Sequence, residues 1–245
     1  MQDQIIDMLR YASGQMEPLR LVVSDASGQV VNQAEINSPF AVIGRGSNCD
    51  LEIQEDVVAY RHVYLQVFAN RVCCLDLMST NGTQIVPPAA SRWISSDHKF
   101  RVGTHWIHLE GDHWQADQAV PSPLDFKTRD EQRVEFGVLP KVELQLLNTS
   151  ASGRLWPINR VVTLIGRDEK CRITIPDERI SRVHCSLLLL PTGLSVIDLL
   201  GKGGIKVNGH PVRCSALPQG SQLQIGDYSV SVHYPDIVHA AILAQ

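Results

Sequence analysis

Two glycine–arginine pairs carry the chemistry of an anion-binding loop. Gly44-Arg45 and Gly166-Arg167 each follow a short apolar run. A glycine allows a ligand or a second loop to come close to the backbone, and the planar guanidinium of arginine offers a fork of donors that matches phosphate oxygens. Such a pair is common in proteins, so its interpretation depends on the residues that come after it.

Groups that suit a phosphate follow the second pair. Ser181 and Arg182 add a hydroxyl and a second guanidinium, and His184 begins the next apolar run. The first two could surround one anion together with Arg167. His184 could have a functional role, as a ligand contact or a base. It could instead be a buried imidazole that ties two loops together by hydrogen bonds. We favour the buried imidazole.

A polar turn is the third element. Residues 79–83 read Ser-Thr-Asn-Gly-Thr, and Asn-Gly is a strong turn signal. Asn81 could also bond the backbone of a ligand. In the second half of the chain, residues 201–204 read Gly-Lys-Gly-Gly, so that Lys202 adds a positive charge there.

A repeat with an offset of 122 residues puts these loops in equivalent positions. Residues 40–53 resemble residues 162–175, and over residues 41–85 about ten of 45 positions are identical without a gap. A register that holds through several turns indicates two copies of one domain. The identities that mark it pair Gly44 with Gly166, Arg45 with Arg167, Cys49 with Cys171, His62 with His184, Asp76 with Asp198 and Gly82 with Gly204.

The elements that must position these loops have the patterns of strands. Residues 62–68, 71–78, 183–190 and 194–200 are short apolar or alternating runs bounded by turn residues. Many short strands with frequent turns predict an all-β chain of two antiparallel β-sandwiches in tandem.

The helical spacing of Ile5 and Leu9 predicts a short amphipathic helix at the N-terminus. A linker is indicated by Pro121, Pro123 and a charged run, and its prolines make it semi-rigid. The C-terminal tail either docks as a short helix or frays. The predicted segments are an N-terminal segment 1–17, a first domain 18–112, a linker 113–137, a second domain 138–236 and a tail 237–245.

At these loops the chain resembles the forkhead-associated (FHA) domain, whose pattern is Gly-Arg, then Ser-x-x-His, then a Ser-x-Asn-Gly turn. The resemblance covers about 190 of the 245 residues. It implies an eleven-stranded sandwich of two sheets that recognises phosphothreonine peptides. It also implies that the arginine and serine contact the phosphate, the asparagine holds the peptide backbone, and the histidine supports the site from behind.

Neither copy matches the family pattern completely. In the first copy the family serine falls on Ala59, and nearby acids such as Asp50 and Glu55 would repel a phosphate. In the second copy the turn asparagine falls on Gly203, which leaves a flexible and cationic turn. The residues expected to bind a phosphopeptide are Arg167, Ser181, Arg182, Lys202, Arg45, Thr80 and Asn81, and those expected to support the site are Gly44, His62, Gly82, Gly166, His184 and Gly204. Basic residues nearby either add to the site or form an ordinary solvated surface; they are Lys170, Arg172 and Arg179.

Charge and composition exclude several classes of protein. The formal net charge of −4 argues against a general nucleic-acid binder. Residues 1–120 carry 8 Lys/Arg against 14 Asp/Glu, and residues 121–245 carry 14 against 12, so an anion site fits the second half better. No apolar run approaches the length of a membrane span, and the N-terminus does not read as a signal peptide. The six cysteines are scattered without a CxxC pair, which favours reduced thiols and a cytoplasmic location.

The sequence also lacks the signatures of an enzyme. Residues 201–204 do not form a P-loop, because Val196 stands where the P-loop requires glycine. No Gly-x-Ser-x-Gly elbow is present. The histidines at 98, 105, 108 and 113 invite a metal interpretation, but His105 and His108 are three apart on a predicted strand and face opposite sides. We expect no metal, no cofactor and no catalysis.

These observations predict a cytoplasmic adaptor that binds a phosphothreonine-containing partner, a kinase or kinase substrate in Ser/Thr kinase signalling, mainly through the second copy. Neither nucleic acid nor a membrane is expected as a partner. The alternative is a phosphate-independent scaffold or homodimer that uses the sandwich surfaces.

Overall fold

The computed structural model describes residues 2–116, 120–125, 137–148, 153 and 155–235. Contacts divide the chain into two compact units, Met1–Ser122 and Pro123–Gln245. The division falls inside the predicted linker, and the other domain boundaries stay predictions. The charged run of the linker at 127–133 and the tail at 237–245 lie outside the described residues.

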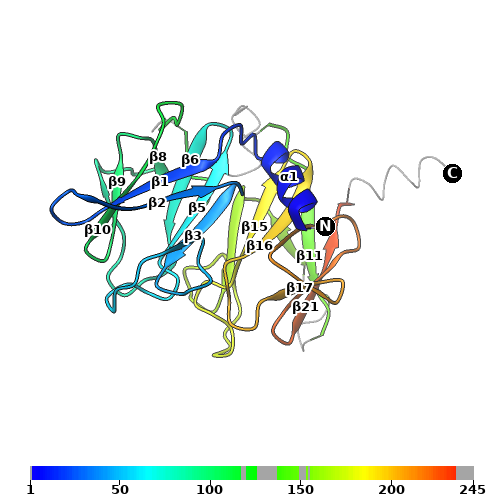
Figure 1. Cartoon of the computed structure of the whole chain (residues 1–245). Coiled ribbons are helices and arrows are strands. Elements are labelled where there is room, and N and C mark those ends of the chain that lie inside the picture. Colours follow the sequence, from blue (N-terminus) through cyan, green and yellow to red (C-terminus); the bar gives the residue numbers. More distant parts are fainter. Residues whose placement is uncertain (1, 117–119, 126–136, 149–152, 154, 236–245) are drawn as a thin grey trace. The chain divides into compact units, whose positions relative to one another are not determined.

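The first unit is a sandwich of two five-stranded sheets, with the strand orders β2-β1-β10-β9-β7 and β4-β3-β5-β6-β8 (Figure 1). One short helix precedes them, as predicted. Its elements are α1 (Gln2–Ala12), β1 (Leu19–Ser24), β2 (Val30–Ile36), β3 (Phe40–Gly44), β4 (Leu51–Glu52), β5 (Val63–Phe68), β6 (Arg71–Asp76), β7 (Gln84–Val86), β8 (Trp93–Ile94), β9 (Lys99–Val102) and β10 (His105–Leu109).

The second unit repeats this arrangement, with a six-stranded sheet β12-β11-β21-β20-β17-β18 and a five-stranded sheet β14-β13-β15-β16-β19. Its elements are β11 (Val142–Leu146), β12 (Leu155–Ile158), β13 (Val162–Gly166), β14 (Ile173–Thr174), β15 (Cys185–Leu190), β16 (Gly193–Asp198), β17 (Ile205–Val207), β18 (His210–Val212), β19 (Cys214–Ala216), β20 (Gln222–Ile225) and β21 (Tyr228–His233).

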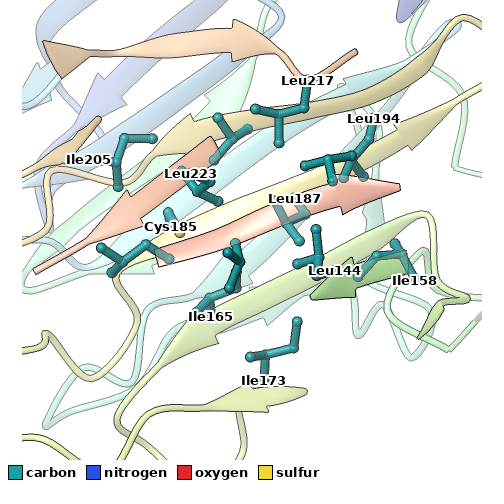
Figure 2. Close-up of a cluster of buried hydrophobic side chains, with 14 of the residues drawn as sticks. Leu144, Ile158, Ile165, Ile173, Cys185, Leu187, Leu194, Ile205, Leu217 and Leu223 are labelled. Carbon is teal, nitrogen blue, oxygen red and sulfur yellow. The ribbon is translucent and has the colours of Figure 1, made fainter. Parts of the chain in front are cut away.

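Apolar side chains of both sheets fill the space between them. Figure 2 shows the core of the second unit, where Leu144 of β11, Ile165 of β13 and Leu187 of β15 point toward one another. All three are at most 2% exposed. Alternation along β11 and β20 leaves the intervening residues outside the core. The first unit has an equivalent core between its own two sheets.

The predicted all-β tandem sandwich is confirmed, with two differences in detail. In each unit one short strand pair is parallel, β3 with β4 and β13 with β14. The second unit has the eleven strands that the FHA resemblance implies, whereas the described part of the first has ten. The residues equivalent to β18 in the first unit are 88–90, which form no strand.

The four tryptophans differ in burial. Trp106 and Trp156 are only partly buried, whereas Trp93 and Trp114 are at most 3% exposed. The Trp93 indole donates to the carbonyl of Val120 at 3.2 Å, which fixes part of the linker segment against the first unit. No helix among the described residues is long and apolar enough to cross a membrane.

Candidate functional site

The glycine–arginine loop and the loop before the next long strand are joined by backbone hydrogen bonds. In the second unit the N–H of Arg167 donates to the carbonyl of Ser181 at 3.0 Å, and the N–H of Asp168 donates to the carbonyl of Arg182 at 3.1 Å. A Cβ on Gly166 would lie 2.0 Å from that Arg182 oxygen. The loops can therefore meet only because this residue is glycine.

The first unit has the same arrangement. The N–H of Arg45 donates to the carbonyl of Ala59 at 3.0 Å, and the N–H of Gly46 donates to that of Tyr60 at 3.0 Å. A Cβ on Gly44 would lie 2.4 Å from the Tyr60 oxygen. Both glycine–arginine pairs therefore hold an exposed arginine beside the loop that carries the serine position.

His184 ties this loop to the polar turn. Its Nδ1 accepts the backbone N–H of Ser181 at 3.3 Å, and its Nε2 lies 3.1 Å from the carbonyl oxygen of Gly204. A backbone N–H can only donate, so Nδ1 is the acceptor and Nε2 carries the proton. The ring is completely buried, and both nitrogens are used within the unit. This geometry matches the buried imidazole rather than a ligand contact or base.

His62 makes the same connection in the first unit. Its Nδ1 accepts the N–H of Ala59 at 3.2 Å, and its Nε2 lies 3.0 Å from the carbonyl oxygen of Gly82. Gly82 and Gly204 have φ values of +68° and +67°, which suit glycine. At Gly82 and Gly204 the backbone therefore adopts a left-handed conformation that favours glycine.

A carboxylate organises each turn, and neither aspartate was among the residues expected to support the site. Asp76 accepts the N–H of Ser79 at 2.8 Å and the hydroxyl of Thr83 at 2.7 Å. Asp198 accepts the N–H of Gly201 at 2.9 Å. The signal was available, because these two aspartates are in register in the repeat.

The second unit keeps open donors around Ser181. The Ser181 Oγ accepts the backbone N–H of Lys202 at 2.9 Å, and no described residue accepts its hydroxyl proton. The side chains of Arg167, Arg182 and Lys202 are exposed, and no carboxylate among the described residues forms an ion pair with them. The loops around Ser181 therefore carry a hydroxyl donor and three exposed cations that form no ion pair among the described residues.

The first unit uses its equivalent groups differently. Ala59 offers no hydroxyl, and the Asn81 amide donates to the carbonyl of Val57 at 2.8 Å, within the unit. Arg45 and Thr80 are exposed, so one cation remains open there. The turn asparagine thus braces a neighbouring loop in the structure.

Two acids of the first unit have structural partners. Asp50 Oδ2 accepts the backbone N–H of Val42 at 2.7 Å. Glu55 accepts the hydroxyl of Thr104 at 2.6 Å and lies 2.5 Å from Nδ1 of His105. Burial alone would raise the pKa of Glu55, but the Thr104 hydrogen bonds and His105 outweigh it and lower this pKa. These contacts fix the two carboxylates in place, and the lowered pKa keeps Glu55 negatively charged.

Arg179 lies outside the set of open cations. Its guanidinium donates to Asp177 at 2.6 Å and also pairs with Asp227 on the β20–β21 turn. Hydrogen bonds from Arg179 lower the pKa of Asp177 to about 2. All three nearby basic residues are exposed, but of the three only Arg179 forms an ion pair among the described residues.

Among the described residues, no group of three or more His, Cys, Asp or Glu side chains could hold a metal ion. Cys171 donates its thiol to the carbonyl of Arg182 at 3.3 Å, and burial raises its pKa to about 12. Cys49 makes the equivalent bond to Tyr60 at 3.2 Å. A raised pKa leaves little thiolate, so the Cys171 thiol is inert.

Solved structures similar to parts of this chain include several FHA domains. One, from work on phosphothreonine-dependent FHA domain interactions, is 28% identical over 38% of this chain and 95% of its own, with a TM-score of 0.36. EmbR from Mycobacterium tuberculosis, in complex with a low-affinity phosphopeptide, is 25% identical over 39% of this chain and 24% of its own, with a TM-score of 0.37. The FhaA FHA domain, complexed with the intracellular domain of another protein, is 28% identical over 38% and 99%, with a TM-score of 0.35.

No curated protein matches the chain. The family model of the FHA domain matches twice, at residues 41–103 and 163–226. The two matches together span more than half of the chain, and each contains one glycine–arginine loop, one bracing histidine and one turn. The chain therefore belongs to the FHA domain family and carries two FHA domains in tandem.

Proposed function

We propose that this chain is an adaptor that binds a phosphothreonine segment of a partner protein, mainly through its second FHA domain. The observation that carries the proposal is the environment of Ser181. The N–H of Lys202 holds its Oγ at 2.9 Å, its hydroxyl proton is unused among the described residues, and Arg167 is bonded to its carbonyl. A phosphate placed there would accept from the hydroxyl and from the arginine fork.

The residues of the first unit support the proposed preference for the second domain. Ala59 replaces the serine, and the Asn81 amide is already bonded to Val57. A phosphate at Arg45 would therefore lose one short hydrogen bond and two further cations. The proposed partner is a kinase or a kinase substrate, because phosphothreonine is a product of Ser/Thr kinases. The adaptor carries out no catalysis of its own.

A screen of the full chain against a degenerate phosphothreonine peptide library tests this function. The matched libraries hold unphosphorylated threonine and phosphoserine at the fixed position. We expect enrichment of phosphothreonine peptides alone, and loss of that enrichment with Arg167→Ala. Equal retention of phosphorylated and unphosphorylated peptides would overturn the proposal.

A second candidate is phosphate-independent contact through the first FHA domain. Val57 and Tyr60 stand on the same loop and are 52% and 51% exposed, which gives this loop an apolar surface where the second unit has Arg179 and Arg182. Tyrosine is enriched in protein interfaces. Sedimentation of the full chain tests whether this surface joins two copies of the chain. A homodimer that Tyr60→Ser dissociates would support self-association.

A further inference from the structure

Three residues with positive side chains adjoin one serine in the second unit. The N–H of Arg167 donates to the Ser181 carbonyl at 3.0 Å, and the N–H of Lys202 donates to the Ser181 Oγ at 2.9 Å. Arg182 follows Ser181 in the chain. The two backbone bonds hold Arg167 and Lys202 beside Ser181, and the side chains of all three cationic residues are exposed.

The first unit shows that this cluster is not a requirement of the fold. The equivalent positions there hold Arg45, Tyr60 and Thr80, of which only the arginine is charged. The backbone bonds of the glycine–arginine loop and of the bracing histidine are the same in both units. The two added cations are therefore a property of the second site itself.

The positive charge of the second site exceeds what one phosphate neutralises. A phosphothreonine carries about −1.5 to −2 at pH 7, against three cationic side chains. The acids within four residues of these cations are Asp168, Glu169, Glu178 and Asp198. The Asp168 carboxylate accepts the N–H of Lys170 at 3.0 Å, and Asp198 accepts the N–H of Gly201 at 2.9 Å. Lys170 and Arg172 offset the charges of Asp168 and Glu169 on the same loop.

We infer that the second FHA domain selects a phosphothreonine that is flanked by further negative charge, either a second phosphate or an aspartate or glutamate. This inference rests on the proposed phosphothreonine binding. An extended peptide advances about 3.3 Å per residue, so a charge within about three residues of the phosphothreonine lies close to Arg182 and Lys202. These side chains hold the flanking charge, while Arg167 and Ser181 hold the phosphothreonine.

Calorimetry with the full Arg45→Ala chain tests the inference, because that background removes the first site. The reference is a phosphothreonine peptide with neutral flanks. Its variants carry Asp, or phosphoserine, at each of the three positions on either side. We expect the best Asp variant to bind about two- to fivefold more tightly than the reference, and the best phosphoserine variant about tenfold or more. Both gains should shrink as salt rises.

The double variant Arg182→Tyr, Lys202→Thr gives these two positions the residues found at the equivalent positions of the first unit, Tyr60 and Thr80. We expect it to weaken both classes of peptide, and to reduce the ratio between the flanked and reference peptides to about one. Lys206→Thr on β17 changes one exposed charge outside the site and should leave that ratio unchanged.

The outcomes separate this inference from the proposed function. A reference peptide that binds, with flanked variants that bind no more tightly, overturns the inference and leaves the function standing. A preference that survives in the double variant also overturns it. If no phosphorylated peptide binds at all, the proposed function itself fails.

Discussion

The Nε2 of His184 donates to the carbonyl oxygen of Gly204 across 3.1 Å, while Nδ1 of the same ring accepts the N–H of Ser181 at 3.3 Å. One buried imidazole thus connects the loop that presents the hydroxyl to the turn that presents Lys202. The completely buried His184 therefore positions the two loops of the proposed site relative to each other.

His184→Ala should lower both stability and binding. It leaves the N–H of Ser181 and the carbonyl of Gly204 without their partner and opens a cavity, at a cost of about 3 kcal/mol of unfolding free energy. Circular dichroism melts measure the first effect and calorimetry with a phosphothreonine peptide the second. His210→Ala, an exposed histidine of the same unit, is the control and should change neither. An unchanged melting temperature for His184→Ala would contradict the bracing role.

Ser181→Ala should weaken phosphothreonine binding without loss of fold. The change removes the hydroxyl donor, and it also removes the acceptor of the Lys202 N–H, which solvent can satisfy because Lys202 is exposed. The expected loss is about 1–2 kcal/mol of binding free energy, because one hydrogen bond to a charged group disappears. Ser181→Thr keeps the hydroxyl and should retain more affinity than Ser181→Ala. Equal losses for the two variants would argue that the hydroxyl is not a ligand.

In the first unit we expect the reverse dependence. Arg45→Ala should change phosphothreonine binding by the full chain little, because Ala59 already lacks the hydroxyl. Ala59→Ser in an Arg167→Ala chain should instead increase phosphopeptide affinity relative to Arg167→Ala alone. Calorimetry checks both. A large loss with Arg45→Ala, together with none for Arg167→Ala, would assign the binding to the first domain.

Asp177 and Arg179 should make a pH-dependent contribution to stability. Hydrogen bonds from Arg179 lower the pKa of Asp177 from its ordinary 3.8 to about 2. A lowered pKa means that the stabilisation is complete above pH 3.8 and disappears as the pH falls through about 2. Asp177→Asn should therefore melt below the wild type at pH 6, and the difference should shrink toward pH 2. Glu178→Gln is the neighbouring control, and a gap that stays constant with pH would contradict this account.

The repeat made the fold and the loop equivalences predictable. A gapless offset of 122 aligned Gly44 with Gly166 and His62 with His184, and each pair makes the same hydrogen bonds or close approaches. Local patterns of this kind carry over because the repeat preserves their spacing. The binding roles of the site residues stay predictions.

Other features depend on contacts between residues far apart in sequence. Arg179 looked like an open cation, but it is held by Asp227, 48 residues away. Glu55 looked like a surface acid without a partner, but its carboxylate accepts the hydroxyl of Thr104, 49 residues away. Local sequence shows the charge of a residue and not its partner. The parallel pairing of β3 with β4 is likewise a tertiary relation, which the two-residue β4 does not reveal by itself.

The most direct test of the central claim is calorimetry of Arg167→Ala in the full chain. The probes are the best phosphothreonine peptide from the library and its unphosphorylated twin. Loss of the guanidinium should weaken the phosphorylated peptide by about ten- to a hundredfold, since each charge-assisted bond contributes about 1.5–3 kcal/mol. The unphosphorylated peptide should not bind either protein. A well-folded Arg167→Ala chain with unchanged affinity would contradict phosphate recognition by the second FHA domain.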